Sequence, residues 1–235
     1  MQTEARERVQ SGAAAELDAV SKVYGGFAAL RNVSVRFENG SCTALLGENG
    51  AGKSTVLRVI AGLIAPTRGS VAVYGAEPRE QRRRMGYMSH ASMLYDELTA
   101  MENLMYFASL HRDGACACVG SPEMALRAVG LDPGLKRPVG QYSQGMRQRT
   151  SLALVLQTDP ELLLLDEPFS NLDAGSAQQM VELLADFRTW PLAGGGRRTV
   201  LLTTHQAGLI GGLVDRTVTM RLGQIAGDTL AGAAA

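Results

Sequence analysis

The segment GENGAGKS at residues 47–54 has the spacing G-x-x-x-x-G-K-[ST], which is typical of a loop that wraps phosphate groups. Its glycines allow backbone N–H groups to approach an anion, and the helix that follows directs its positive N-terminus at the same point. The Lys53 ammonium is suited to the β- and γ-phosphates of a nucleotide, and the Ser54 hydroxyl is suited to Mg²⁺. The pattern therefore predicts a nucleotide site, with an ordinary glycine-rich turn as the alternative.

Two acidic side chains, Asp166 and Glu167, end the apolar run LLLLDEP at residues 162–168. An uninterrupted apolar run is typical of a strand that is buried on both faces, so both carboxylates are expected at a strand end. Asp166 is suited to hold a metal ion through water, and Glu167 is suited to polarise the water that attacks a γ-phosphate. A solvated strand end that carries acids by chance is the alternative, which the phosphate-binding loop makes less attractive.

A second segment, YSQGM at residues 142–146, has the features of another anion-binding helix start. Ser143 can cap a helix, and Gly145 leaves the backbone of its first turn open. Taken alone, the segment is better explained by an ordinary helix cap. Together with the phosphate-binding loop, it gives one chain two helix starts that are suited to phosphate.

The elements that would position these residues follow from the periodicity of the chain. The runs SCTALLG, LLLLDEP and RTVLLTTH are predicted to be buried strands, and they alternate with helical patterns, which favours an α/β fold with a parallel sheet. From about residue 87 to 150 the pattern is mostly helical. Residues 16–25 and 31–40 alternate apolar and polar positions as half-buried strands do, and the polar residues 1–15 are expected to form a flexible tail.

Composition limits the class of protein. The 235 residues carry 23 basic and 23 acidic side chains, so bulk charge gives no support for a nucleic-acid partner. Cys42 lies in an apolar run, and Cys116 and Cys118 lack a second cluster at metal-ligand spacing, so free, reduced thiols in a cytosolic setting are expected. The charged N-terminus does not resemble a secretory signal, and no apolar run approaches the roughly 20 residues that span a bilayer. A soluble chain is therefore expected.

The motifs taken together resemble a known family. Tyr24, GENGAGKST, YSQGM, LLLLDEP, SNLD and TTH occur in the order and rough spacing of an ABC transporter ATP-binding cassette, and the resemblance covers residues 17–228. It implies a P-loop NTPase fold with a mostly parallel central sheet, an antiparallel β subdomain and a helical signature subdomain at about residues 88–150. The ATP-binding domain would occupy residues 16–230.

The resemblance also implies an activity and partners. The chain would hydrolyse ATP with Mg²⁺ and power a separately encoded membrane permease from the cytoplasmic face of the inner membrane. The signature of one subunit would close over the nucleotide of another in a head-to-tail dimer. This arrangement explains why one chain needs two anion-binding helix starts. No nucleic acid is expected as a partner.

Roles are carried over from the family to the matching positions of this chain. The resemblance implies that Tyr24 stacks on adenine, that Glu167 is the general base, and that His205 contacts the γ-phosphate and holds the attacking water. Ser143 and Gly145 would contact the γ-phosphate of the partner subunit's nucleotide. The remaining residues implied in ligand binding are Gly47, Glu48, Asn49, Gly50, Ala51, Gly52, Lys53, Ser54 and Thr55 for the phosphates, Ser54 and Asp166 for the metal, and Asp173 at the dimer interface.

The signature departs from the common LSGGQ of this family, because residues 142–146 read YSQGM. The serine and the second glycine, which contact phosphate, are kept, and similar signatures occur in working exporter cassettes. We therefore interpret the signature as competent.

His90 stands where most cassettes carry a glutamine that touches Mg²⁺ and the attacking water. Imidazole is a poor direct ligand for Mg²⁺, but a neutral imidazole can position water. His90, the following LTAMENL and the later LTTHQ are similar to the ATP-binding subunit of the bacterial haem exporter of cytochrome c maturation. The helical segments also resemble drug and lipid exporter cassettes, and drift at a surface turn is a further explanation of His90.

Other classes of nucleotide-hydrolysing protein account for these motifs less completely or equally well. A soluble ABC ATPase of iron–sulfur assembly fits the same motifs, whereas a DNA-repair ATPase would separate the loop from the signature by far more than the roughly 90 residues found here. A GTPase or small kinase would leave YSQGM, SNLD and TTH without a role. Coupling to a permease predicts an exposed apolar groove near residues 88–110, with Met93, Leu94 and Tyr95 as candidates to line it.

Overall fold

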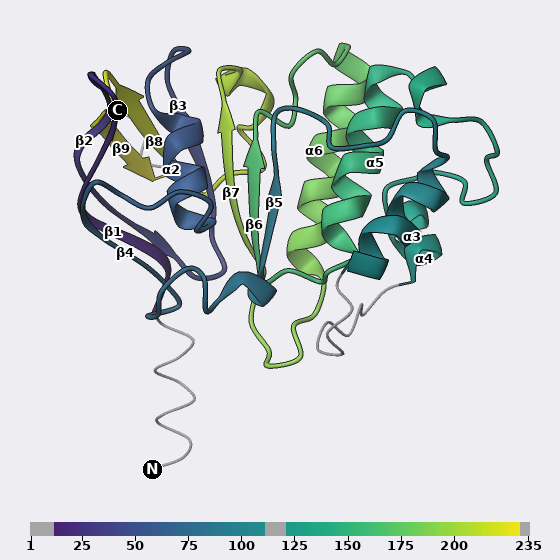
Figure 1. Cartoon of the computed structure of the whole chain (residues 1–235), viewed down its shortest axis with the longest axis horizontal. Coiled ribbons are helices and arrows are strands. Elements are labelled where there is room, and N and C mark those ends of the chain that lie inside the picture. The colour runs from purple at the N-terminus through teal and green to yellow at the C-terminus, as the bar shows by residue number, and fades with distance from the viewer. Residues whose placement is uncertain (1–11, 111–120, 231–235) are drawn as a thin grey trace.

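The computed structural model describes residues 12–110 and 121–230, which form two sheets and the helices that pack on them (Figure 1). In the six-stranded sheet the order is β5-β6-β7-β3-β8-β9, and in the three-stranded sheet it is β2-β1-β4. The strands of the larger sheet are β3 (Cys42–Leu46), β5 (Met85–Met88), β6 (Leu162–Asp166), β7 (Thr199–Thr204), β8 (Arg216–Arg221) and β9 (Gln224–Leu230). Those of the smaller sheet are β1 (Ala13–Tyr24), β2 (Phe27–Glu38) and β4 (Arg68–Val73).

The larger sheet is parallel except at one edge. All pairs from β5 across to β8 are parallel, and only β9 is antiparallel, to β8. Because parallel strands end at the same edge of a sheet, the ends of β3, β6 and β7 are neighbours, and the register pairs Leu46 with Thr204 and Asp166 with Thr203. The expectation of a mostly parallel α/β sheet is confirmed, and the segments that follow these strands meet at this edge.

The smaller sheet is antiparallel throughout. Its first strand begins at Ala13, and both Ala14 and Ala15 are fully buried, so the expected tail of residues 1–15 was too long at its C-terminal end. Residues 13–15 are alanines next to a charged segment, so their sequence gave no indication of a strand. In the structure, the carbonyl of Ala14 accepts a hydrogen bond from the backbone N–H of Tyr74. Residues 1–11 lie outside the described chain.

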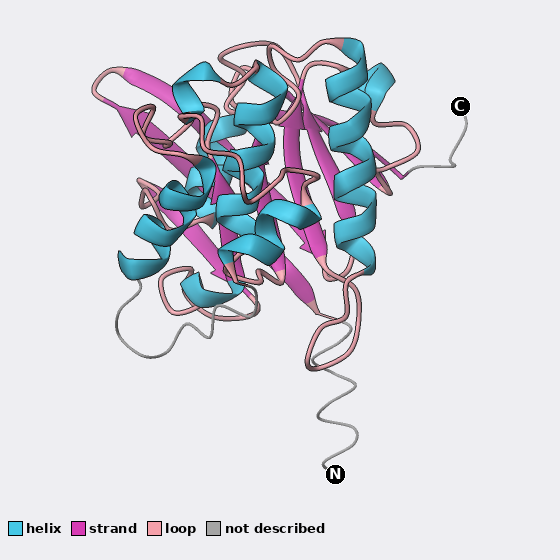
Figure 2. Cartoon of the chain, turned by 90° about the vertical axis from the view of Figure 1, so that its right-hand side faces the viewer, coloured by secondary structure: helices cyan, strands magenta, loops and turns pink. Residues whose placement is uncertain are grey.

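Five α-helices are found in the described residues: α2 (Lys53–Ile60), α3 (Ala100–Leu110), α4 (Pro122–Ala128), α5 (Gln144–Leu156) and α6 (Ala174–Thr189). Figure 1 shows α2 on one side of the larger sheet and α5 and α6 on the other, and α3 and α4 lie nearest the viewer in the turned view of Figure 2. The helical insert is therefore present, but its expected boundary at about residue 150 falls inside α5, which continues to Leu156.

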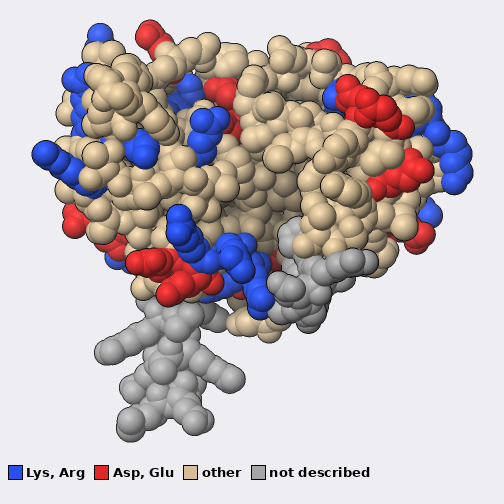
Figure 3. Space-filling model, in the orientation of Figure 1, with Lys and Arg blue, Asp and Glu red and all other residues tan. Residues whose placement is uncertain are grey.

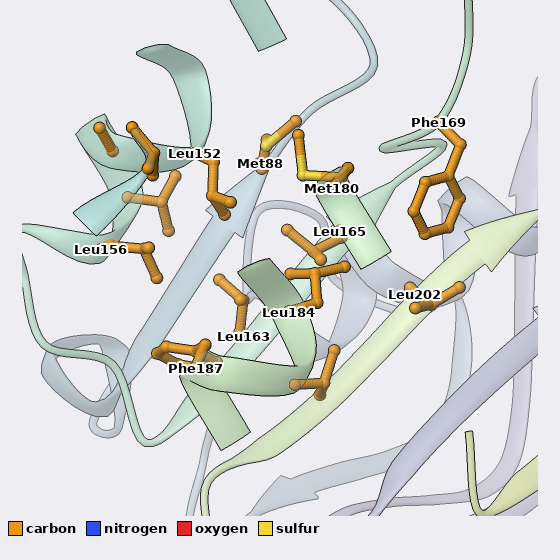
Figure 4. Packing of buried hydrophobic residues seen from close by; sticks show 14 of the residues in the cluster. Met88, Leu152, Leu156, Leu163, Leu165, Phe169, Met180, Leu184, Phe187 and Leu202 are labelled. Atoms are coloured by element: carbon orange, nitrogen blue, oxygen red, sulfur yellow. The ribbon is translucent and has the colours of Figure 1, made fainter. Parts of the chain in front are cut away.

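Alternation along the buried strands divides the core in two. Leu163 and Leu165 of β6 face α5 and α6, whereas Leu162 and Leu164 face α2 and the smaller sheet. Figure 4 shows the first of these clusters, in which the labelled residues are Met88, Leu152, Leu156, Leu163, Leu165, Phe169, Met180, Leu184, Phe187 and Leu202. Because β6 is apolar on both faces, it is buried between the two clusters, and Asp166 at its end is buried with it.

The surface agrees with the charge balance of the sequence. On the face shown in Figure 3, basic and acidic side chains lie interspersed, and no large region of it carries one sign. No helix within residues 12–110 and 121–230 combines the length and the apolar character needed to cross a bilayer. Cys42 is a buried free thiol, and burial raises its pKa to about 12. Cys116 and Cys118 lie outside the described residues.

Candidate nucleotide-binding site

The phosphate-binding loop connects the end of β3 with the start of α2, as the sequence predicts. Gly52 stands at the N-cap of α2 with φ 105°, and Gly47 has φ 145°. A Cβ atom at Gly47 would lie 2.4 Å from the carbonyl oxygen of Met220, and one at Gly52 would lie 2.7 Å from that of Ala29. These glycines are therefore needed for packing against neighbouring strands as well as for access to an anion.

Lys53 is held inside the loop. Its Nζ donates hydrogen bonds to the carbonyl oxygens of Gly47 at 2.7 Å and Glu48 at 3.1 Å, and it lies 3.5 Å from Oε1 of Glu167. Only 5% of the residue is exposed. The loop's own carbonyls thus fix the ammonium at the start of α2, where it lies beside the Glu167 carboxylate.

Asp166 and Ser54 are joined directly. The Ser54 hydroxyl donates to Oδ1 of Asp166 at 2.7 Å, and the same oxygen accepts a hydrogen bond from Oγ1 of Thr203 at 2.9 Å. Thr203 Oγ1 also accepts the backbone N–H of Glu167 at 2.8 Å. One hydroxyl on β7 therefore positions both acids, a role that no local pattern in the sequence indicates, because it depends on which strands are neighbours.

Tyr87 borders this group from β5. Its hydroxyl lies 3.5 Å from Oδ2 of Asp166, and burial raises the pKa of Tyr87, an effect that its hydrogen bond with Arg58 opposes. The hydrogen bond with Tyr87 raises the pKa of Arg58 in turn. Both side chains were absent from the sequence-based site.

Glu167 has an unusual backbone conformation. Its φ is 53°, in the left-handed region that non-glycine residues rarely adopt. Oε2 lies 3.0 Å from Nδ1 of the exposed His205, which directly follows β7. Oε1 is buried and forms no hydrogen bond within the described chain, with Lys53 as its nearby charge. The carboxylate is therefore held at one oxygen by His205, while the other oxygen is buried beside Lys53 with its hydrogen-bonding capacity unused.

These side chains line one cleft of about 890 Å³. It brings together most of the residues that the sequence assigned to the site: Tyr24, Asn49, Gly50, Ala51, Gly52, Lys53, Ser54, Thr55, His90, Asp166, Glu167 and His205. It also contains Phe27 and Arg58, which were not predicted. Tyr24 and Phe27 face each other across the turn between β1 and β2 and are 44% and 61% exposed. Two exposed aromatic rings at the cleft suit a planar base.

Five predicted residues are not among those that line this cleft: Gly47 and Glu48 at the start of the loop, and Ser143, Gly145 and Asp173 elsewhere in the chain. Ser143 caps α5 by accepting the N–H of Met146 at 3.2 Å, and Asp173 caps α6 by accepting the N–H of Ser176 at 2.9 Å. The hydrogen bonds from Ser176 lower the pKa of Asp173. A Cβ atom at Gly145 would lie 2.6 Å from Oγ of Ser176, so the two caps adjoin. The structure thus gathers Ser143, Gly145 and Asp173 into one group, separate from the chain's own cleft.

The side chains present fit a bound Mg²⁺. Ser54 and Asp166 offer hard oxygen donors, and no group of three or more His, Cys, Asp or Glu side chains suited to a metal is found in the described residues. Mg²⁺ is usually bound by one or two protein oxygens together with phosphate and water, so a site with few protein donors beside a phosphate-binding loop is suitable.

The apolar surface predicted near residues 88–110 is present in part. Met93 is 66% exposed and Tyr95 is 46% exposed, whereas Leu94 is half-buried and packs against the core, so it contributes less to the exposed surface than its two neighbours. Tyr106 of α3 packs edge-on against Tyr95, with 5.1 Å between ring centroids, and Met105 beside it is 57% exposed. The exposed apolar surface therefore extends onto α3, within the predicted range of residues 88–110, although Met105 and Tyr106 were not named as its candidates.

Comparisons with known proteins identify the family of this chain. The sequence profile described as ABC transporter matches residues 30–170. The chain is 33% identical to the ABC transporter ATP-binding protein NatA of Bacillus subtilis (strain 168) over 202 residues, which cover 84% of this chain and 80% of that protein. It is 38% identical to a fluoroquinolones export ATP-binding protein of Mycobacterium tuberculosis over 201 residues, covering 84% and 64% of the two chains.

Other relatives are described as import ATP-binding proteins. Among solved structures, the chain is similar to an ATP-binding cassette in a dimeric, post-hydrolysis state bound to ADP and Pi, with a TM-score of 0.79 and 25% identity. The match covers 92% of this chain and 98% of that one.

Proposed function

The chain belongs to the ABC transporter family of ATP-binding proteins, and from this premise we propose that its ATP hydrolysis drives export through a separately encoded membrane permease. As a member of the family it binds and hydrolyses ATP with Mg²⁺ and works as a dimer with permease subunits. The observation that carries the assignment of roles is the convergence of Lys53, Asp166 and Glu167 at the mouth of one cleft.

The nucleotide is bound by two parts of the cleft. The backbone of residues 47–52 and the Lys53 ammonium bind its phosphates, and the rings of Tyr24 and Phe27 contact its base. Ser54 and Asp166, which are hydrogen-bonded to each other, are the residues that would hold Mg²⁺ beside the phosphates. When bound, the ion would supply positive charge that stabilises the phosphate oxygens during hydrolysis.

Glu167 accepts the proton of the attacking water. Its Oε1 is buried and has no hydrogen-bond partner among the described residues, so it has an acceptor position for a water molecule. The hydrogen bond from His205 to Oε2 orients the carboxylate, and the exposed imidazole lies at the cleft, where it can contact the terminal phosphate. His90 also lines the cleft, and its imidazole helps to position the same water molecule.

The second group of residues acts on the nucleotide of the other subunit. Ser143, Gly145 and Asp173 lie together at two helix starts but outside the chain's own cleft. A head-to-tail dimer would place this group over the partner's phosphates, where the helix N-termini favour negative charge. Each chain would then supply the phosphate-binding loop of one active site and the signature of the other.

The permease docks on the apolar surface beside α3. Met93, Tyr95, Met105 and Tyr106 are exposed there, and a cluster of exposed aromatic and methionine side chains is typical of an interaction surface. This surface adjoins the segment that carries His90. A conformational change at the bound nucleotide would therefore be transmitted to the permease through that segment. The chain would thus bind the cytoplasmic face of the membrane through its partner.

Sequence identity does not separate export from import, since the chain is 38% identical to a protein named for fluoroquinolones export and 37% identical to one named for Fe(3+) import. The export proposal rests on the resemblance of the segment after His90 to exporter cassettes. Haem for cytochrome c maturation is the substrate that we propose to test first, because His90, LTAMENL and LTTHQ resemble the subunit of that exporter. Drug or lipid export is the alternative substrate class, and a soluble iron–sulfur assembly ATPase is the alternative of another kind.

The test is affinity purification of the tagged chain from its native membranes, with identification of the co-purifying proteins and a visible spectrum. A permease with haem-handling partners and a Soret band would support haem export. An unrelated permease would reject haem and keep the transport function. Recovery from the soluble fraction alone, with no membrane protein, would contradict the transport proposal in favour of the iron–sulfur alternative.

A further inference from the structure

Arg147 of α5 links the signature to the chain segment between His90 and α3. Its Nη2 donates a hydrogen bond to Oδ1 of Asp96 at 2.6 Å, and its Nη1 donates to the carbonyl oxygen of Val139 at 3.1 Å. The backbone N–H of Arg147 donates to the carbonyl oxygen of Ser143 at 2.9 Å, in the first turn of the helix. One residue therefore joins the start of α5, the turn before it and the segment that carries Asp96.

The same two segments are also joined along their backbones. The N–H of Gly140 donates to the carbonyl oxygen of Asp96 at 2.9 Å, and the N–H of Val139 donates to that of Leu98 at 2.8 Å. A Cβ atom at Gly140 would lie 3.0 Å from the Asp96 carbonyl oxygen, so a residue without a side chain is what allows the two backbones to approach this closely. The turn at residues 139–141, which leads into Ser143, is thereby held against residues 96–98.

Asp96 is itself anchored to α3 through the residue before it. The fully buried Asn103 of α3 accepts the backbone N–H of Tyr95 at 2.8 Å and donates to the carbonyl oxygen of Tyr95 at 3.1 Å. The Asp96 side chain is 57% exposed and that of Arg147 is 20% exposed. Ion pairs with an exposed partner contribute little to stability, so we expect this pair to act mainly through the position that it gives to the start of α5.

We propose that Asp96 and Arg147 are positioning residues for the signature, which hold Ser143 where it contacts the nucleotide of the other subunit. This inference rests on the head-to-tail dimer of the proposed function. Loss of the pair would free the start of α5 from its anchor and misplace Ser143, and small errors in the placement of reacting groups lower the rate strongly. Neither Asp96 nor Arg147 lines the chain's own nucleotide cleft, so the defect would appear only at the partner's nucleotide.

Asp96→Ala breaks the pair, and Glu97→Ala is its matched control, because it removes the same charge from the next residue, which is also exposed. In the full chain we expect Asp96→Ala to lower ATP turnover by about tenfold or more while ATP affinity stays within about twofold of the parent. Arg147→Gln removes the other partner and should reproduce this result, which keeps a test available if Asp96→Ala does not fold. Turnover of Asp96→Ala equal to that of Glu97→Ala would overturn the proposal.

Mixtures of variants distinguish a signature defect from a defect in the chain's own cleft. Asp96→Ala mixed with Lys53→Ala should hydrolyse ATP well above the mean of the two separate rates, because one site of the mixed dimer combines an intact loop with an intact signature. Asp96→Ala mixed with Ser143→Arg should show no recovery, because both defects lie in the signature.

The other outcomes of these mixtures overturn the proposal. Recovery with Ser143→Arg but not with Lys53→Ala would place Asp96 in the site of its own chain, and recovery with neither would indicate a general structural defect. The mixture of Lys53→Ala with Ser143→Arg tests the dimer separately. If that mixture recovers, a failure of Asp96→Ala concerns this inference alone; if it does not, the head-to-tail arrangement is wrong and the inference is wrong with it.

Discussion

Nδ1 of His205 lies 3.0 Å from Oε2 of Glu167, across the ends of the neighbouring strands β6 and β7. The contact fixes one carboxylate oxygen, and Thr203 fixes the backbone of the same residue through a hydrogen bond of 2.8 Å. The other oxygen, Oε1, is left buried without a hydrogen-bond donor in the described chain. A base whose backbone and one carboxylate oxygen are both held in place has a fixed orientation, which favours proton transfer from a water in one position.

Glu167→Gln should therefore bind ATP normally and lose catalysis. The amide keeps the shape of the side chain but cannot accept a proton, so we expect turnover to fall by roughly 10²–10⁴-fold, the range of general-base catalysis. Nucleotide affinity and hydrolysis would be measured on the same preparation. Turnover within about twofold of the parent would remove Glu167 from its proposed role.

Thr203→Val tests the hydroxyl that joins the two acids. The change removes the acceptor for the Glu167 N–H and the donor to Asp166, which lie 2.8 and 2.9 Å away. Because a buried N–H is left without a partner, we expect the free energy of unfolding to fall by about 1–3 kcal/mol, and the Mg²⁺ requirement of hydrolysis to rise. Urea denaturation and a Mg²⁺ titration provide the two readouts.

Thr43→Val is the matched control for this change. Thr43 is equally buried, on β3, but its hydroxyl forms no hydrogen bond within the described residues. Removing a buried, unpaired hydroxyl should leave stability unchanged or raise it. If Thr43→Val destabilises the protein as much as Thr203→Val, the loss in the latter comes from packing and not from the hydrogen bonds.

His90 lines the cleft and is exposed. If its imidazole positions the attacking water, His90→Gln, which can also donate and accept hydrogen bonds, should keep most of the activity, while His90→Ala should lose about tenfold or more. Steady-state ATP hydrolysis by the parent, His90→Gln and His90→Ala is the measurement that tests this role. Equal rates would mean that His90 is a surface residue without a part in the reaction.

The proposed head-to-tail dimer can be tested by mixing two inactive chains, one with Lys53→Ala and one with Ser143→Arg. In the mixed dimer, one site combines an intact loop from the second chain with an intact signature from the first. We therefore expect hydrolysis to recover on mixing, well above the rate of either variant alone. Absence of recovery, with mixed dimers demonstrated by two different tags, would mean that Ser143 acts on its own chain's nucleotide.

The sequence predicted those parts of the site that depend on local spacing. The loop at residues 47–54 and the strand end at Asp166 and Glu167 each lie within a few residues, so their chemistry was visible without a fold. Thr203 and Tyr87 were missed because their roles depend on β7 and β5 lying beside β6. The strand start at Ala13 was missed because small side chains carry little hydrophobic signal, although the sheet buries them.

Exposure was the least predictable property. Leu94 lies between two exposed residues, yet it packs against the core, and periodicity in a segment without regular secondary structure cannot indicate which side chain turns inward. A cavity of about 330 Å³, separate from the nucleotide cleft, also left no trace in the sequence, because it is formed where α4, α5 and the segment after α6 meet.

The buried thiol of Cys42 should make stability depend on alkaline pH. Burial raises its pKa from 9.0 to about 12, so the folded chain retains a proton that the unfolded chain loses. The contribution of this group is complete below pH 9 and is lost as the pH rises from 9 towards 12. At pH 10.5 the loss would be about 2 kcal/mol, since each pH unit in this window corresponds to about 1.4 kcal/mol.

Cys42→Ala removes this titration. We expect it to reduce stability by a fixed amount at pH 7, through lost packing, and to lose less further stability than the parent between pH 9 and 10.5 in urea denaturation. The pKa of Tyr74, also raised to about 12 by burial, acts with the same sign in both proteins and cancels in the comparison. Parallel stability curves for the parent and Cys42→Ala over this range would show that the thiol titrates alike in the folded and unfolded chains.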